Sequence, residues 1–290
     1  MENIKDIFQK IAPVPLPKQL VGACLYASDK DELKATQFSS YCDFVLGVEP
    51  SAPRRARVSA AWQRNDGDTT IVWATGLSFE QLCCLVRRSF LKLAAAKNGN
   101  DCLEAHLDLK RAASIAARWR VTGDLLKAAP ELSQSALECF ASAALLLAHM
   151  HTLESVTDLK SRAGLWRSVA SAASSLLEPL ASGVEDEDDD DDDRFDQVVL
   201  LQVRRYAEVC AVSCSAGVHF GEGRLASACA CSQRALERAH DNDDFFDKKF
   251  LESLENEYQR YFFVKKKLGD VVSEKNYESG LLMPAVALPF

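Results

Sequence analysis

Apolar side chains recur at intervals of three to four residues through most of the chain from Ser78 onward, which is the spacing of one face of an α-helix. In the first such segment, about residues 78–97, Ser78 is a suitable N-cap and Asn-Gly-Asn at 98–100 is a stop signal. A chain dominated by this period is predicted to be mainly α. The apolar positions of the segment are Leu82, Leu85, Val86, Phe90, Leu93 and Ala94.

The same spacing predicts six further helices. Pro179 should end the third of them, because proline restricts the residue before it. Small residues alternate with larger ones on both sides of Gly221–Gly223, as in a tetratricopeptide-like helical hairpin. The predicted helices span about residues 102–120, 133–156, 159–178, 195–219, 224–240 and 245–268.

The first part of the chain has a different composition. RARVSAAW (55–62) and TTIVWAT (69–75) are rich in β-branched and aromatic residues, and they flank Asp66-Gly67, a strong turn signal. We therefore expect a small N-terminal β-hairpin or sheet beside the helices. The expected organisation is a mixed N-terminal segment, 1–57, followed by a helical domain, 58–290.

The acidity of the chain is local. The formal net charge is −8, and the run EDEDDDDDD at 185–193 supplies nine negative charges, so the remainder carries +1. A block of like charges repels itself and stays solvated, which predicts a disordered acidic loop at 182–194. We expect no nucleic-acid partner, because no basic stripe with interleaved aromatic residues is present.

The ten cysteines form no CxxC pair, and most of them lie in apolar helical sequence. This usage is typical of buried, reduced thiols in a cytoplasmic protein, although a zinc site stays open as an alternative. No run of about 18 uncharged apolar residues predicts a membrane span. The N-terminus lacks the basic end and apolar run of a signal peptide.

Four segments, in order, resemble the Alix-type Bro-one domain family. They are VSAAWQRND (58–66), LSFEQLCCLVRRSFLKLAAA (77–96), the helix pair LDLKRAASIAARW (107–119) and APELSQSALECFASAALLLAHMHTLES (129–155), and KKKLGDVVSEKNYESGLLMPAVALPF (265–290). The resemblance covers about residues 58–290, whereas residues 1–57 match the family poorly.

The resemblance implies a fold and a role. The fold would be a curved helical solenoid with a small sheet. The role would be that of a monomeric, non-enzymatic adaptor without a cofactor, which binds the amphipathic C-terminal helix of an ESCRT-III subunit. Such an adaptor would be cytoplasmic and would associate peripherally with endosomal membranes.

The resemblance also implies a partner-binding site. It places Leu165 and Val169 at apolar groove positions of the family and Leu153 near a third, with Arg162 among the flanking basic residues. Leu103 and Leu107 stand where the family has lysines, which is a departure from its pattern.

Two apolar stripes run along the predicted helix 159–178. Either both stripes are core, or one is core and the other faces a partner helix. One stripe contains Trp166, Ala170, Ala173 and Leu177, and the other contains Leu165, Val169, Ala172 and Leu176.

Three other functions compete with the adaptor. The two acidic clusters, at 185–193 and 241–244, are compatible with a magnesium-dependent isoprenyl-diphosphate enzyme, but nine consecutive acids would point in all directions. A generic tetratricopeptide-like interaction scaffold is the second alternative. The third is a membrane-surface protein, because Lys265–Lys267 lie beside Phe262 and Phe263.

Overall fold

The structure is a computed structural model of the 290-residue chain. It describes residues 2–15, 42–43, 45–47, 59–64, 71–75, 77–119, 129–181, 195–241 and 246–268, and these residues are mainly helical. The chain forms two compact units, which are described separately. The N-terminal unit contains Ile4–Leu145 and Asp189–Val199, and the C-terminal unit contains Met1–Asn3, Leu146–Asp188 and Leu200–Phe290.

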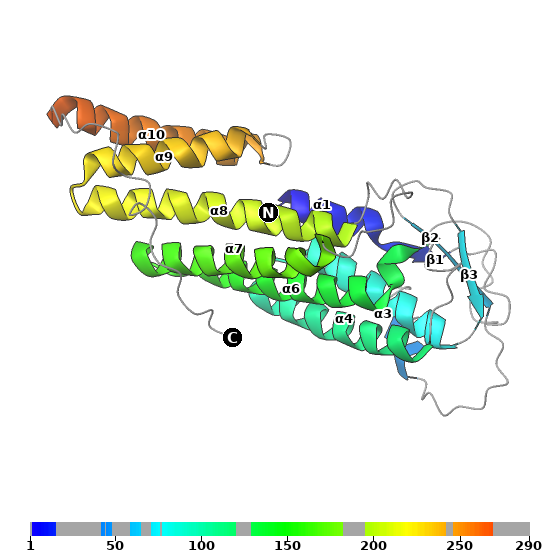
Figure 1. Ribbon diagram of the computed structural model, residues 1–290. Coiled ribbons are helices and arrows are strands. Elements are labelled where there is room, and N and C mark those ends of the chain that lie inside the picture. The colour runs from blue at the N-terminus through cyan, green and yellow to red at the C-terminus, as the bar shows by residue number, and fades with distance from the viewer. Residues whose placement is uncertain are drawn as a thin grey trace. The chain divides into compact units, whose positions relative to one another are not determined.

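The N-terminal unit combines helices with a small antiparallel sheet (Figure 1). The sheet has the strand order β1-β2-β3, and in its register Trp62 lies opposite Val72. The turn predicted at Asp66-Gly67 lies outside the described residues. The elements are α1 (Glu2–Ile11), β1 (Pro13–Pro15), β2 (Ser59–Arg64), β3 (Ile71–Thr75), α3 (Leu77–Ala94), α4 (Gly99–Trp119), the 3-10 helix η2 (Pro130–Leu132) and the first part of α6 (Gln134–Leu153).

Three phenylalanines from different helices form an aromatic cluster in the N-terminal unit. The ring of Phe90 on α3 lies 5.4 Å from that of Phe8 on α1 and 5.0 Å from that of Phe140 on α6, centroid to centroid. All three side chains are fully buried. Aromatic pairs at such tilted and edge-on geometries add to the free energy of burial, so the cluster holds α1, α3 and α6 together.

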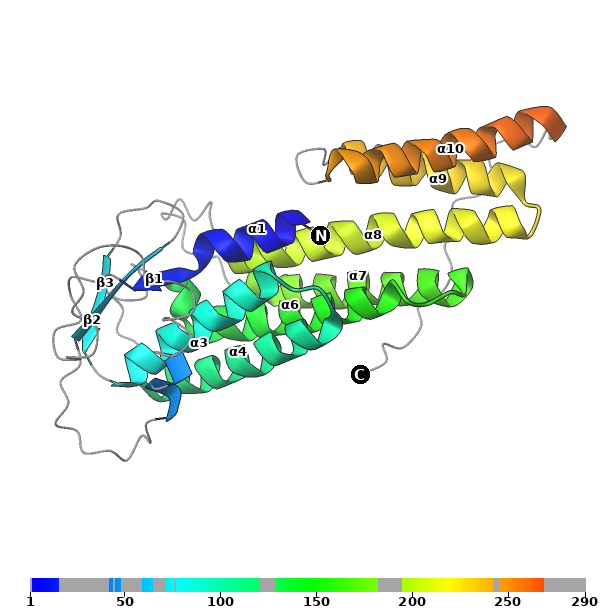
Figure 2. The same cartoon turned by 180° about the vertical axis from the view of Figure 1, so that it is seen from behind.

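The C-terminal unit is built from the end of α6 and from α7 (Leu159–Ala181), α8 (Phe195–Gly221), α9 (Leu225–His240) and α10 (Lys248–Leu268). Both views show α8, α9 and α10 running side by side (Figures 1 and 2). Aromatic stacking joins α8 to α10, with the Phe220 and Tyr261 ring centroids 4.6 Å apart.

A glycine turn joins α8 to α9. Gly223 has a φ of +77°, in the left-handed region that glycine adopts without steric cost. The Arg224 N–H donates to the carbonyl of His219 over 2.9 Å, and the Gly223 N–H donates to that of Phe220 over 3.1 Å. This pair of bonds is a Schellman motif, which satisfies the last carbonyls of α8 and reverses the chain into α9.

Each predicted helix is present to within a few residues, with one correction, and the structure adds α1, which the apolar spacing did not predict. The segment predicted to stop at Glu178 continues through Pro179 to Ala181 as α7. Pro179 has no N–H to donate to the preceding turn, so α7 lacks one backbone hydrogen bond there, and the helix ends two residues later. The acidic run 185–193 lies outside the described residues, and the curvature of the predicted solenoid stays a prediction.

Among the described residues, α6 is the one helix that is long and apolar enough to cross a membrane by length and composition alone. In the fold, 72% of its most apolar stretch is buried. A central core helix of a globular protein meets the same criteria.

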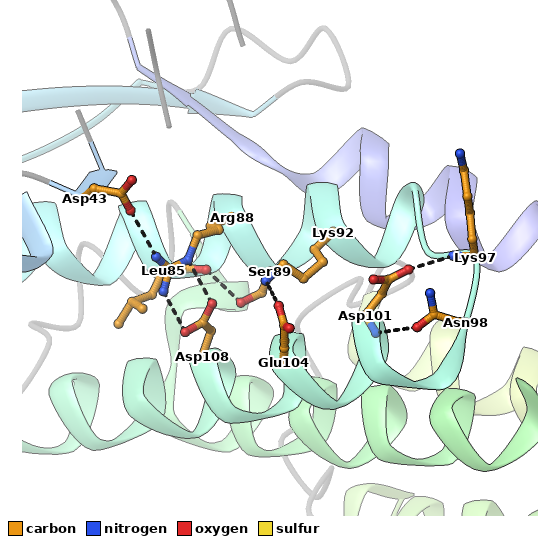
Figure 3. A network of polar contacts seen from close by, with 10 residues as sticks. All are labelled: Asp43, Leu85, Arg88, Ser89, Lys92, Lys97, Asn98, Asp101, Glu104 and Asp108. Carbon is orange, nitrogen blue, oxygen red and sulfur yellow. Dashed lines mark hydrogen bonds and ion pairs between the residues drawn. The ribbon is translucent and has the colours of Figure 1, made fainter. Parts of the chain in front are cut away.

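Polar side chains bridge α3 and α4 (Figure 3). Arg88 donates two hydrogen bonds to the Asp108 carboxylate, at 2.8 and 2.7 Å from Nε and Nη2. Burial lowers the pKa of Arg88, but the hydrogen bonds and charge of Asp108 outweigh this effect and raise it above its ordinary value. Lys92 and Glu104 form a second ion pair at 2.6 Å, in which the Glu104 side chain is largely exposed.

These two ion pairs should differ in their contribution to stability. We expect Asp108→Asn to lower the free energy of unfolding by about 2 kcal/mol, because it leaves a partly buried guanidinium without its bidentate partner. Glu104→Gln is the matched control and should cost about 0.5 kcal/mol or less, because exposed pairs contribute little. Urea denaturation of the three proteins measures both changes. Equal losses would contradict the burial argument.

Candidate functional site

Helix α7 carries four of the five predicted partner-binding residues, while Leu153 is the last residue of α6. The start of α7 is set by Asp158. The Ser161 N–H donates to Oδ2 of Asp158 over 2.8 Å, which makes Asp158 the N-cap. Hydrogen bonds from the Ser161 side chain and backbone lower the pKa of Asp158. The cap therefore carries its negative charge at neutral pH, beside the positive end of the helix dipole.

One face of α7 packs into the core of the C-terminal unit. Ala163 packs with Val218 of α8, and the Trp166 ring lies 5.8 Å from the Tyr206 ring, centroid to centroid. Close approach is possible because Gly217 has no side chain: a Cβ there would lie 3.0 Å from Leu159. These contacts fix the rotation of α7 about its own axis.

That rotation separates the predicted site residues into two groups. Leu153, Trp166 and Val169 are buried, and Val169 has 0% exposure. Leu165 and Arg162 are partly exposed. The expectation that Val169 lines an open groove therefore does not fit its position, because contacts within the chain already cover it. Leu165 is the predicted apolar residue that a partner can reach.

Leu165 belongs to a row of partly exposed residues, which we call the α7 stripe: Leu165, Ser168, Ala172 and Leu176. The intervals of three, four and four residues place them on one face of the helix. The sequence pattern contained three of these four positions. It missed Ser168, whose hydroxyl donates to the carbonyl of Gly164 over 3.1 Å and so turns its polar group back onto the helix.

Arg162 is tied to its own chain. Its Nε donates to the carbonyl of Val156 over 2.7 Å, which anchors the segment before α7. Arg167, the other basic residue beside Leu165, is exposed. In the N-terminal unit Leu107 has 61% exposure, so an apolar side chain stands at the surface where the resembled family has lysine.

The described cysteines do not resemble a nucleophile or a metal site. All nine are free thiols, either buried or partly buried. Burial raises the pKa of Cys83, and a hydrogen bond with Cys42 together with burial raises that of Cys84, so the thiolates are disfavoured. The described residues contain no group of three histidine, cysteine or acidic side chains that could hold a metal. The acidic cluster at 185–193 and residues 242–244 lie outside them.

Comparison with solved structures identifies the fold. A structure described as the ALIX BRO1 CHMP4C complex matches with a TM-score of 0.56 at 15% identity, covering 93% of this chain and 81% of that one. ALIX in complex with the SIVmac239 PYKEVTEDL late domain also matches with a TM-score of 0.56 at 15% identity, over 91% of this chain. This chain spans only 42% of that longer protein.

The fold is therefore similar to that of a BRO1 domain. The likeness extends over 93% of this chain, whereas the sequence resemblance covers about residues 58–290. It is a likeness of structure, since no family model and no curated protein matches the sequence.

Val169 and Leu165 should respond differently when an aspartate replaces them. We expect Val169→Asp to lower the free energy of unfolding by more than about 3 kcal/mol, because it places a carboxylate in a closed core. Leu165→Asp should cost less than about 1 kcal/mol, because the new carboxylate can reach solvent. Thermal unfolding followed by circular dichroism measures both. Similar large losses would show that the α7 stripe is core.

Proposed function

We propose that this chain is a protein-binding adaptor that captures the amphipathic C-terminal helix of an ESCRT-III subunit along the α7 stripe. The observation that carries the proposal is the likeness of the fold to an ALIX BRO1 domain in complex with CHMP4C. The Bro-one resemblance of the sequence independently implies an ESCRT-III partner. The adaptor acts as a monomer in the cytoplasm at endosomal membranes, without enzymatic activity or a cofactor.

The chemistry of the α7 stripe supports this function. Leu165, Ala172 and Leu176 provide apolar surface, and Ser168 uses its hydroxyl within the helix. A partner helix with apolar residues at i, i+3 and i+4 can pack along such a face. Leu165 is the central anchor in this proposal, while Trp166 and Val169 support it from the core.

The test is binding of a synthetic C-terminal peptide of CHMP4C to the full chain, followed by fluorescence anisotropy. We expect the unaltered protein to bind, and Leu165→Asp to weaken binding about 30-fold or more, because losing one buried apolar anchor costs about 2 kcal/mol. Phe263→Asp is the matched control, since it places the same charge at an exposed apolar residue of α10 and should bind normally.

The possible outcomes distinguish a failure of the proposed function from a failure of the proposed contact surface. Absence of binding by the folded, unaltered protein would overturn the adaptor function for this partner class. Normal binding by Leu165→Asp would leave the partner intact but overturn the α7 stripe as the contact surface. Thermal unfolding of each variant shows whether a loss of binding is a loss of folding.

A further inference from the structure

The charges of α10 are unevenly distributed along the helix. Residues 258–268 contain Arg260 and Lys265–Lys267 and no acidic residue, whereas residues 248–257 contain two lysines and three glutamates. The helix dipole favours lysines at a helix C-terminus, which explains the basic end of α10 but not the aromatic residues beside it. No ion pair joins these three lysines to a carboxylate in the part of the chain that the structure describes.

Two aromatic side chains are exposed beside the lysines. Phe262 has 45% exposure and Phe263 has 55%, and they are two of the four large apolar side chains at the described surface. A single exposed apolar residue is ordinary, but adjacent aromatic rings next to a basic cluster mark an interaction surface. Near this end of α10, Tyr261 makes the stacking contact with α8.

Tyr261 turns inward and fixes which residues face out. Its ring stacks on Phe220 of α8, and its hydroxyl donates to Glu257 over 2.6 Å. Ser213 of α8 donates to the other oxygen of Glu257 over 2.7 Å. Because α10 is held on this side, the next two side chains point away from the contact with α8.

Four exposed side chains and the half-buried Tyr258 form a mixed aromatic and cationic surface, which we call the α10 patch: Tyr258, Phe262, Phe263, Lys266 and Lys267. Lys267 Nζ lies 4.5 Å from the centroid of the Phe263 ring, and the Tyr258 and Phe262 rings lie 6.0 Å apart. Aromatic rings favour the boundary between lipid headgroups and acyl chains, and lysines favour lipid phosphates.

We propose that the α10 patch docks the protein on an anionic lipid surface. Phe262 and Phe263 enter the headgroup region, and Lys266 and Lys267 pair with phosphate and carboxylate groups of the lipids. A lipid surface suits this patch better than an acidic peptide, because the flexible lysines require no partner at a fixed register. The proposal does not depend on the α7 stripe or on its partner.

The experiment is co-flotation of the full chain with vesicles of phosphatidylcholine alone or mixed with phosphatidylserine. We expect binding only to the mixed vesicles, weakening as salt is raised. The double variant Lys266→Glu/Lys267→Glu should bind at least about 25-fold more weakly, since each lysine near an anionic surface contributes about fivefold. The matched control is Lys248→Glu/Lys249→Glu, with the same change of charge at the exposed start of α10.

A second pair of variants tests the aromatic part. Phe263→Ser should weaken flotation, whereas Leu107→Ser, which removes an exposed apolar side chain from α4, should not. Absence of flotation by the unaltered protein, or equal losses in the two lysine variants, would overturn the proposal. Capture by a polyglutamate resin together with no vesicle binding would also overturn it and assign the patch to an acidic protein. Leu165→Asp should float normally.

Discussion

The packing of α7 against α8 is the contact on which the surface of the C-terminal unit depends. Ala163, Gly217 and Val218 are small enough for the two helices to approach closely, and the Trp166 ring then meets Tyr206. A rigid contact of this kind leaves α7 one rotation about its axis. This rotation buries other residues of α7 and leaves Leu165 partly exposed.

The same principle organises α10. Tyr261 is the inward anchor, and its contacts with Phe220 and Glu257 leave Phe262 and Phe263 at the surface. Each proposed surface thus lies next to a buried aromatic residue on its own helix. The two surfaces have different chemistry: the α7 stripe is uncharged, and the α10 patch is aromatic and cationic. One protein could in this way hold a helical partner and a lipid surface independently.

Several polar groups of the described residues connect helices. The bidentate Arg88–Asp108 pair and the Glu257 carboxylate, with its two hydroxyl donors, join helices to one another. Burial raises the pKa of the Cys214 and Cys231 thiols to about 11, so both stay protonated at neutral pH. The inter-helix hydrogen bonds among these groups stabilise the fold.

The sequence alone determined the helices, because apolar periodicity and capping signals act over a few residues. It also predicted the turn between two helices at Gly221–Gly223, and it limited the candidate binding surface of α7 to two neighbouring apolar stripes. It did not show that α1 joins the core, since Phe8 is buried against Phe90, far along the chain. Only the tertiary structure decided that Val169 is covered while Leu165 is accessible, and that Tyr261 turns inward while Phe262 and Phe263 turn out. The reason is physical: the burial of a residue depends on side chains from distant segments of the chain, and the local spacing of residues contains no information about them.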